Sequence, residues 1–222
     1  MSFDYYKEKL SAERLRQAYE IAPPRVRQYL RSEIEFVKSR MNPHDTVVEL
    51  GCGFGRVLLA LADHAGILYG IDNSPTSIRL AKQIHADNVR LAVMDAVAMA
   101  FADKVFDLVV CIQNGISAFH VDPVQLVRES LRITRPGGRV LLSSYSDKFW
   151  ADRLKWFELQ AQHGLHGEID YEATRPGRIV SRDGFFGTTY SADDFRKIVS
   201  NFTAAYAIHE IDESSLFCEI VT

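Results

Sequence analysis

The hydrophobic positions of this chain change their spacing along its 222 residues. In the middle of the chain, short apolar runs alternate with segments of helical spacing. The apolar runs span residues 46–50, 67–71, 89–94, 106–112 and 139–145, and the helical segments span 54–63, 75–86 and 122–134. The run at 106–112 is too apolar to have a solvent-exposed face, which is typical of a central strand. This alternation predicts an α/β fold whose parallel sheet is covered by helices on both faces.

The regions on either side of the alternation predict a cap and the end of the sheet. Residues 5–19 and 25–41 have helical spacing around two prolines, so we expect a helical N-terminal cap at residues 1–44. Near the other end, two strand-like runs follow a short helix, and these elements span 191–199, 203–212 and 216–221. They complete a core that we assign to residues 45–146 and 191–222.

Between these core segments, the sequence predicts an insertion. Residues 148–162 predict a helix with two tryptophans. Arg175-Pro176-Gly177-Arg178 is a turn signal between strand-like runs at 168–174 and 179–190, which predicts a β-hairpin. We therefore expect a lid made of one helix and one hairpin at residues 147–190.

Composition and charge are ordinary for a soluble globular protein, with 47% hydrophobic and 25% charged residues. The net charge of -3 argues against nucleic acid as the main partner, because phosphate binding usually requires a basic surface. Residues 1–20 are mostly polar and charged, and no apolar run approaches the roughly 20 residues of a membrane span. We therefore expect a cytoplasmic protein without membrane segments.

The three cysteines give no sign of a metal centre or a disulfide framework. Cys52, Cys111 and Cys218 are scattered, and no Cys/His spacing matches a zinc site. Reduced cysteines in an intracellular protein are the simplest interpretation. We expect no bound metal.

A glycine-rich turn carries the strongest functional signal. Glu49-Leu50-Gly51-Cys52-Gly53-Phe54-Gly55 joins a predicted buried strand to a predicted helix. Glycines in such a turn allow the backbone to approach a ligand, and the amides at the helix start face it. The spacing is G-x-G-x-G, whereas the dinucleotide fingerprint is G-x-G-x-x-G. The spacing therefore points away from NAD and toward another nucleoside.

This turn resembles the first motif of class I S-adenosylmethionine-dependent methyltransferases. Four further segments resemble motifs of the same family in the same order, and they are Gly70-Ile71-Asp72-Asn73-Ser74, Val93-Met94-Asp95-Ala96, residues 106–111 and residues 131–140. Together the five segments cover about residues 45 to 145. The resemblance implies a Rossmann-like, seven-stranded, mostly parallel sheet with an antiparallel last strand. It also implies S-adenosylmethionine as cofactor and S-adenosylhomocysteine as product.

The resemblance assigns residues to the cofactor. The loop residues Gly51, Cys52, Gly53 and Gly55 pass close to its methionine and ribose portions, and Glu49 accepts hydrogen bonds at the same end. The remaining positions follow the next three strands, and they are Asp72 for the ribose, Asn73 as a further cofactor-binding residue, Asp95 and Ala96 for the adenine, and Gln113 through its backbone.

Each of the two aspartates has an alternative role. Asp72 precedes Asn73-Ser74-Pro75, a helix-start signature, and is therefore also a candidate helix cap. Asp95 is also compatible with an ordinary exposed loop.

The acceptor side is less well defined by the sequence. Methyl transfer is a nucleophilic displacement in which alignment and desolvation do much of the work, and a base is needed only if the acceptor must lose a proton. His120, just before a predicted helix, is the candidate base, with a structural role as the alternative. The candidate acceptor-binding residues are Tyr5, Tyr6, Asn114 and Tyr145.

Our prediction is an enzyme, a methyltransferase that acts on an oxygen or nitrogen of a small molecule. The segment Gln113-Asn114-Gly115-Ile116 lacks the N-P-P-Y or D-P-P-Y motif of amide methyltransferases of DNA and protein. The alternatives are a non-catalytic module that binds S-adenosylmethionine, an RNA or protein methyltransferase, and an NAD(P)-dependent oxidoreductase. The sequence names neither the acceptor nor an oligomeric state.

Overall fold

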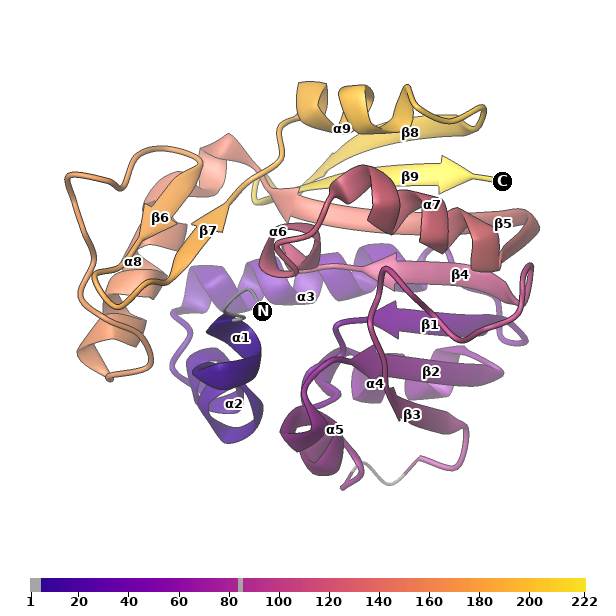
Figure 1. Ribbon diagram of the computed structural model, residues 1–222, viewed down its shortest axis with the longest axis horizontal. Helices are drawn as coiled ribbons and strands as arrows, with labels where there is room; N and C mark the ends of the chain where they lie inside the picture. The colour runs from indigo at the N-terminus through magenta and orange to yellow at the C-terminus, as the bar shows by residue number, and fades with distance from the viewer. Residues whose placement is uncertain (1–4, 84–85) are drawn as a thin grey trace.

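A seven-stranded sheet forms the centre of the protein, for which a computed structural model describes residues 5–83 and 86–222 (Figure 1). The strand order is β3-β2-β1-β4-β5-β9-β8. The strands are β1 (Thr46–Leu50), β2 (Ile67–Asp72), β3 (Val89–Val93), β4 (Phe106–Cys111), β5 (Thr134–Tyr145), β8 (Ala205–Ile211) and β9 (Ser215–Val221). Strands β1 to β5 pair in parallel, while β9 is antiparallel to both β5 and β8. The predicted Rossmann-like sheet with an antiparallel last strand is therefore confirmed.

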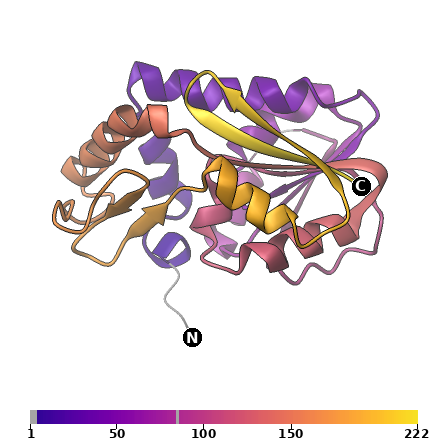
Figure 2. The same ribbon diagram turned by 90° about the horizontal axis from the view of Figure 1, so that it is seen from above.

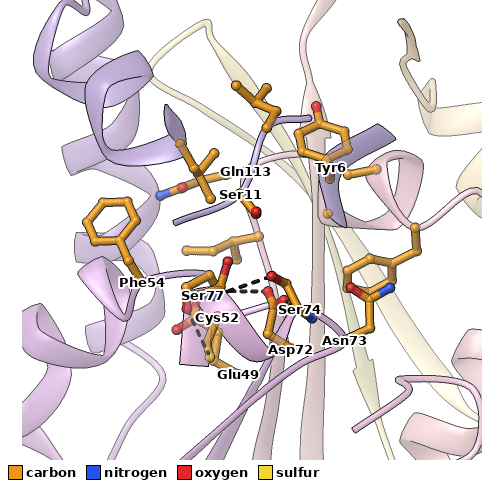
Figure 3. Close-up of a pocket in the computed structure, with 18 of the residues that line it drawn as sticks. Tyr6, Ser11, Glu49, Cys52, Phe54, Asp72, Asn73, Ser74, Ser77 and Gln113 are labelled. Atoms are coloured by element: carbon orange, nitrogen blue, oxygen red, sulfur yellow. Dashed lines mark hydrogen bonds between the residues drawn. The ribbon is translucent and has the colours of Figure 1, made fainter. Parts of the chain in front are cut away.

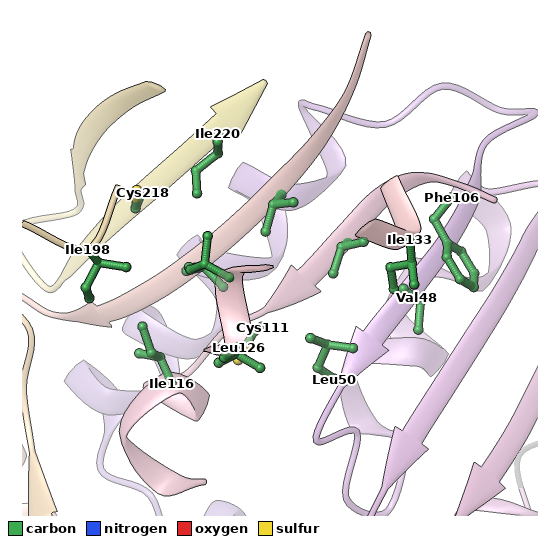
Figure 4. Packing of buried hydrophobic residues seen from close by; sticks show 14 of the residues in the cluster. Val48, Leu50, Phe106, Cys111, Ile116, Leu126, Ile133, Ile198, Cys218 and Ile220 are labelled. Atoms are coloured by element: carbon green, nitrogen blue, oxygen red, sulfur yellow. The ribbon is translucent and has the colours of Figure 1, made fainter. Parts of the chain in front are cut away.

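Helices cover both faces of this sheet (Figure 2). One face carries α3 (Pro24–Lys38), α4 (Arg56–Leu61) and α5 (Pro75–Ala81), and the other carries α7 (Pro123–Ile133) and α9 (Ala192–Val199). Alternate residues of a strand point to opposite faces, so Val47 packs with the first group and Val48 with the second. Both are fully buried, which explains why the parallel strands read as continuous apolar runs. Figure 4 shows the hydrophobic cluster between the sheet and helices α7 and α9, in which Leu126 and Ile198 pack against the strands.

Further helices and a hairpin lie beyond the carboxyl ends of the parallel strands (Figure 1). They are α1 (Tyr5–Glu8), α2 (Ala12–Glu20), α8 (Trp150–Gln162), β6 (Arg178–Val180) and β7 (Phe186–Thr188). Their apolar side chains form a cluster of their own that includes Tyr5, Leu10, Phe157 and Phe185. The cluster supports the helical cap and the hairpin insertion of the predicted fold. The division at residues 1–44, 45–146 with 191–222, and 147–190 stays a prediction.

The hairpin differs from the prediction in its position. Strands β6 and β7 pair across residues 181–185, whereas the predicted first strand at 168–174 contributes only a bridge between Ile169 and Ser181. The reason is local, because Asp170 Oδ1 accepts hydrogen bonds from the amides of Glu172 and Ala173 and folds the segment into a turn. The predicted turn at 175–178 does form, but it leads into β6 instead of joining the two main strands.

The remaining elements are short. They are α6 (Gly115–Ala118), which the sequence did not predict, and the 3-10 helices η1 (Ala62–His64) and η2 (Asp147–Phe149). Strand β5 begins at Thr134, five residues before the predicted start at Arg139, because Gly137, at φ +79°, lets the strand bulge beside β4. Helix α6 directly follows β4 and carries the chain from the sheet edge toward the lid.

Candidate functional site

A cavity of about 340 Å³ lies at the carboxyl edge of the sheet, beneath α2 and α8. Strand β1 has β2 on one side and β4 on the other, and the chain changes direction at this point of the sheet. Ligands of open α/β sheets bind in the crevice at such a switch point. The cavity is lined by the loops that follow β1, β2, β3 and β4, so it collects the sequence motifs that are far apart in the chain (Figure 3).

The glycine loop needs its glycines for two reasons, backbone conformation and space. Gly51, Gly53 and Gly55 have φ angles of +72°, +54° and +85°. A Cβ on Gly51 would lie 2.6 Å from Phe119 Cε1, and one on Gly53 would lie 2.9 Å from Leu15 Cδ2. Gly51 and Gly53 line the cavity together with Cys52, while Gly55 occupies the N-cap of α4 and does not line it.

Glu49 is a buried acid with spare hydrogen-bonding capacity. Its side chain is 5% exposed, and its Oε2 has no hydrogen-bond partner among the residues that the structure describes. Burial raises the pKa of its carboxyl to about 8, and Arg56 opposes this shift while Asp72 adds to it. A buried carboxylate oxygen without a donor is costly unless a ligand supplies one. A cationic amine fits this position.

Asp72 ends β2 and binds the glycine loop. Its Oδ2 accepts from the Gly53 amide at 2.9 Å, and its Oδ1 accepts from the Ser74 amide at 2.8 Å. Ser74 is the N-cap of α5, since its hydroxyl accepts from the Ser77 amide. The capping role that the sequence left open for Asp72 therefore belongs to Ser74. Both Asp72 and Asn73 line the cavity.

The loop after β3 forms the next part of the wall. Asp95 and Ala96 line the cavity with Met94 and Val97. Asp95 Oδ1 accepts a hydrogen bond from the Val97 amide at 3.0 Å, which fixes the loop. Asp95 is exposed, so a ligand can reach its other oxygen, Oδ2. This geometry accommodates an amino-group donor at the sheet edge.

Gln113 and Asn114 follow β4 in the left-handed conformation, with φ angles of +58° and +62°. The Gln113 amide donates to Glu33 Oε2 at 2.7 Å and to Ser143 Oγ at 2.8 Å. Its side-chain oxygen accepts from the Tyr19 hydroxyl at 3.0 Å. The backbone N–H of Gln113 is already bonded to these two acceptors. The groups of Gln113 that remain for a ligand are therefore its backbone carbonyl and its side chain. Gln113 lines the cavity.

Asn114 lies outside the cavity lining. Its Nδ2 donates to the Thr188 carbonyl at 2.9 Å, and its Oδ1 accepts from the Ser144 hydroxyl at 2.8 Å. The first bond joins the end of β4 to β7 of the hairpin, and the second joins it to β5. The structure therefore places Asn114 as a link between sheet and lid.

The aromatic candidates separate in the same way. Tyr6 and Tyr145 line the cavity, whereas the Tyr5 hydroxyl donates to Asp183 Oδ2 at 2.5 Å and lies in the lid cluster. His120 lines the cavity at a φ of +52°, with its ring 4.3 Å from that of Phe186. It therefore lies where the loop after β4 meets the hairpin.

Several lining residues had no functional signal in the sequence. They come mainly from the cap and the lid, and they include Ser11, Leu15, Ala18, Tyr19, Phe54, Arg56, Phe119, Trp156, Phe157 and Gln160. The last three lie within one wide stripe of α8, in which Phe157 and Gln160 are three residues apart and Trp156 and Gln160 four. That spacing indicates a buried face of the helix, but it does not indicate that the face covers a cavity.

Other kinds of site are not found in the described chain. Within residues 5–83 and 86–222, no group of three or more His, Cys, Asp or Glu side chains is arranged to hold a metal ion. None of the helices in these ranges is long and apolar enough to cross a membrane. The three cysteines are free and buried.

Comparison with known proteins identifies a domain of one family. Residues 48–142 match the model of a family described as a methyltransferase domain. The chain is 29% identical over 137 residues to 2-methyl-6-phytyl-1,4-hydroquinone methyltransferase from Synechocystis sp., covering 57% of this chain and 42% of the relative. It is 30% identical over 110 residues to the ubiquinone biosynthesis O-methyltransferase of Coxiella burnetii, covering 47% of this chain and 45% of the relative. The chain thus spans less than half the length of these curated relatives.

The fold has a close structural counterpart. Magnesium protoporphyrin IX methyltransferase from Synechocystis, solved with S-adenosylhomocysteine bound, superposes with a TM-score of 0.64 at 18% identity. The superposition covers 99% of this chain and 97% of that one, so it includes the cap and lid regions as well as the sheet. Residues 48–142 of this chain thus match a methyltransferase domain, and the chain has the fold of class I S-adenosylmethionine-dependent methyltransferases.

Proposed function

We propose that this chain binds S-adenosylmethionine in the cavity and transfers its methyl group to an oxygen or nitrogen of a small molecule. The observation that carries the proposal is the Glu49 carboxyl group, which is buried beside the glycine loop and has one oxygen without a hydrogen-bond partner among the described residues. Asp72 and Asp95 line the same cavity at the ends of the next two strands. The three acids lie in the order in which an amine, a ribose and an adenine occur along the cofactor.

The residues present suit the parts of this cofactor. Glu49 would accept from the amine, Asp72 would accept from the ribose hydroxyls with lone pairs left after its two backbone bonds, and Asp95 would accept from the adenine amino group. When bound, the cofactor supplies an electrophilic methyl group on a sulfonium.

The cap and lid would give the acceptor its alignment and exclude water. Tyr6, Tyr19 and Tyr145 line the cavity with Trp156 and Phe157, so its acceptor end is largely aromatic. An enclosed apolar wall desolvates the nucleophile and holds it near the methyl group. Where the acceptor carries a proton, an imidazole nitrogen of His120 would take it, since His120 lines the same cavity.

A small-molecule acceptor is favoured by this enclosure and by the relatives, whose names refer to a hydroquinone and to ubiquinone biosynthesis. A polymeric acceptor needs an open approach, which α2 and α8 restrict because they form part of the cavity wall. We also propose that the protein is cytoplasmic and that nucleic acid is not its partner. The support for this proposal is the set of buried free cysteines and the net charge of -3.

Calorimetric titration tests the cofactor assignment. The purified protein is titrated separately with S-adenosylhomocysteine, NAD and NADP, and the first titration is repeated on Asp72→Asn and on Asp63→Asn. Asp63 is an exposed acid outside the cavity, so its variant is the matched control. We expect binding of S-adenosylhomocysteine alone, weakened about tenfold or more by Asp72→Asn because a ribose hydrogen bond to a charged group is lost.

Each other result has a defined meaning. A preference for NAD or NADP would identify an oxidoreductase and overturn the proposal. Binding of S-adenosylhomocysteine without turnover on any small acceptor would favour the non-catalytic module. Turnover on RNA or protein in place of small acceptors would move the activity to the polymer class.

A further inference from the structure

Arg153 is a buried cation next to the acceptor end of the cavity. Its side chain is 1% exposed and lies on α8. Its Nη2 donates to the Gly187 carbonyl at 3.1 Å, while Nε and Nη1 have no hydrogen-bond partner among the described residues. Among the residues that the structure describes, the titratable groups that act on it are the hydroxyls of Tyr145, Tyr6 and Tyr29, and none of these is a carboxylate.

Such an arrangement is costly unless it serves a ligand. A guanidinium keeps its charge in proteins, and a buried charge is normally paired with an acid. Here burial lowers the pKa of Arg153, and the two aromatic contacts compensate only in part, with the guanidinium 4.5 Å from the Tyr145 ring centre and 5.6 Å from that of Phe157. By comparison, the partly buried Arg25 forms an ion pair with Asp212 at 2.6 Å.

The position of Arg153 links it to the acceptor. Arg153, Trp156, Phe157 and Gln160 follow the i, i+3, i+4, i+7 spacing of one helix face, and the last three line the cavity. Tyr145, whose ring contacts the guanidinium, lines it as well. Arg153 thus lies directly behind the wall formed by Tyr145 and Phe157.

The charges along the cavity are arranged unevenly. The acids Glu49, Asp72 and Asp95 lie on the sheet side, at the part assigned to a cationic cofactor, where they outnumber the basic Arg56. Arg153 lies on the lid side, behind side chains that are otherwise aromatic. A charge in a low-dielectric interior acts strongly over several ångströms, so the lid side favours an anion.

We propose that the methyl acceptor is a flat apolar compound with a carboxylate, and that Arg153 selects it by favouring that carboxylate at the wall of Tyr145 and Phe157. The inference rests on the proposed function, because it concerns the acceptor of the same site. In this role Arg153 determines specificity and does not take part in the chemical step.

Paired probes test this selection in the full-length protein saturated with S-adenosylhomocysteine. A panel of hydroxylated benzoates and cinnamates is compared with the corresponding methyl esters, using calorimetry to measure each dissociation constant. We expect at least one acid to bind about tenfold or more tightly than its ester, because the Arg153 charge acts on the carboxylate through a low-dielectric wall. In Arg153→Met that preference falls to about onefold, while the affinity for S-adenosylhomocysteine stays unchanged.

Lys155→Met is the matched control, because it removes an exposed positive charge from the same helix. It is expected to keep the preference of the wild type. If circular dichroism shows that Arg153→Met does not fold, Arg153→Lys replaces it and is expected to keep part of the preference, because it keeps the charge but not the planar fork.

The outcomes separate the two proposals. Failure of S-adenosylhomocysteine to bind would overturn the proposed function itself. Normal binding of S-adenosylhomocysteine with no acid preferred over its ester anywhere in the panel would overturn only the role of Arg153. The same conclusion follows if the preference persists undiminished in Arg153→Met.

Discussion

The raised pKa of Glu49 predicts that cofactor binding depends on pH in a range where most carboxylates are fully ionised. The pKa of this carboxyl is about 8 because the side chain is buried. The ammonium group of the ligand requires the carboxylate form, so binding must expel the proton that Glu49 holds at neutral pH. We therefore expect the affinity for S-adenosylhomocysteine to rise with pH between pH 6 and pH 8, and Glu49→Gln to remove that dependence.

The size of the effect follows from the ionised fraction. With a pKa of about 8, roughly half of the Glu49 side chains are ionised at pH 8, about a tenth at pH 7 and about a hundredth at pH 6. An apparent dissociation constant rises in proportion as the competent fraction falls. The affinity should therefore weaken about fivefold from pH 8 to pH 7 and about tenfold from pH 7 to pH 6, where the slope approaches about 1.4 kcal/mol per unit.

Calorimetry in buffers of different ionisation enthalpy measures both the affinity and the proton released on binding. We expect about one proton to be released per ligand near pH 7, because Glu49 is mostly protonated there before binding. In Glu49→Gln the release should vanish, and the remaining affinity should be nearly independent of pH.

A second buried acid supplies the necessary control. Burial raises the pKa of Glu33 to about 7, and its Oε2 accepts from the Gln113 amide at 2.7 Å, so it titrates in a nearby range close to the site. Glu33→Gln should keep the pH dependence assigned to Glu49. A flat affinity in the wild type, or an unchanged slope in Glu49→Gln, would refute the reasoning.

Three further predictions concern stability and turnover. Because the folded-state pKa of Glu49 is raised from about 4.5 to about 8, the stabilisation that its proton provides is full below about pH 4.5 and declines as the pH rises through 8. Urea unfolding of the ligand-free protein should therefore show wild-type stability falling between pH 6 and pH 8 by up to about 1.4 kcal/mol per unit more than in Glu49→Gln. Gly51→Ala should destabilise the protein by about 1–3 kcal/mol more than Gly137→Ala in the same assay, since both have positive φ but only Gly51 faces Phe119 at 2.6 Å. His120→Asn, which tolerates the positive φ of +52°, should lower kcat about a hundredfold while leaving the affinity for S-adenosylhomocysteine unchanged, and an unchanged kcat would contradict a role as base.

The sheet is predictable because each strand carries its own signal. Apart from Asp107, strand β4 is apolar on both faces, and helices α5, α7 and α9 begin at capping residues that the sequence displays, of which Asp122 and Ser191 are examples. The hairpin is less predictable, because two turn signals compete in one segment. The Asp170 side chain folds residues 170–174 into a turn that the sequence did not predict. The two paired strands of the hairpin therefore form later in the chain, as β6 and β7.

The site divides along the same line. Residues such as Asp72 and Asp95 lie at fixed distances from strand ends, so a sequence motif locates them at the sheet edge. Glu33 gave no such signal, because it lies within α3 and reaches Gln113 only through tertiary packing. Tyr19 and Phe157 belong to helices in which the spacing of apolar residues indicates a buried face. That spacing does not indicate which part of the protein the face packs against.

The packing explains why one sheet of this kind can serve different acceptors. Two large hydrophobic clusters bind the helices to the sheet, and the cap and lid have a third cluster of their own. Tyr145 at the end of β5 and Tyr29 of α3 are the points at which the sheet and its flanking helix enter this third cluster. A substitution on α8 or the hairpin can therefore reshape the acceptor wall without disturbing the strand ends that hold Asp72 and the glycine loop. Since function resides in sites grafted on folds, the cofactor end should tolerate little change, and the identity of the acceptor should be decided by the cap, by the lid and by Arg153 within it.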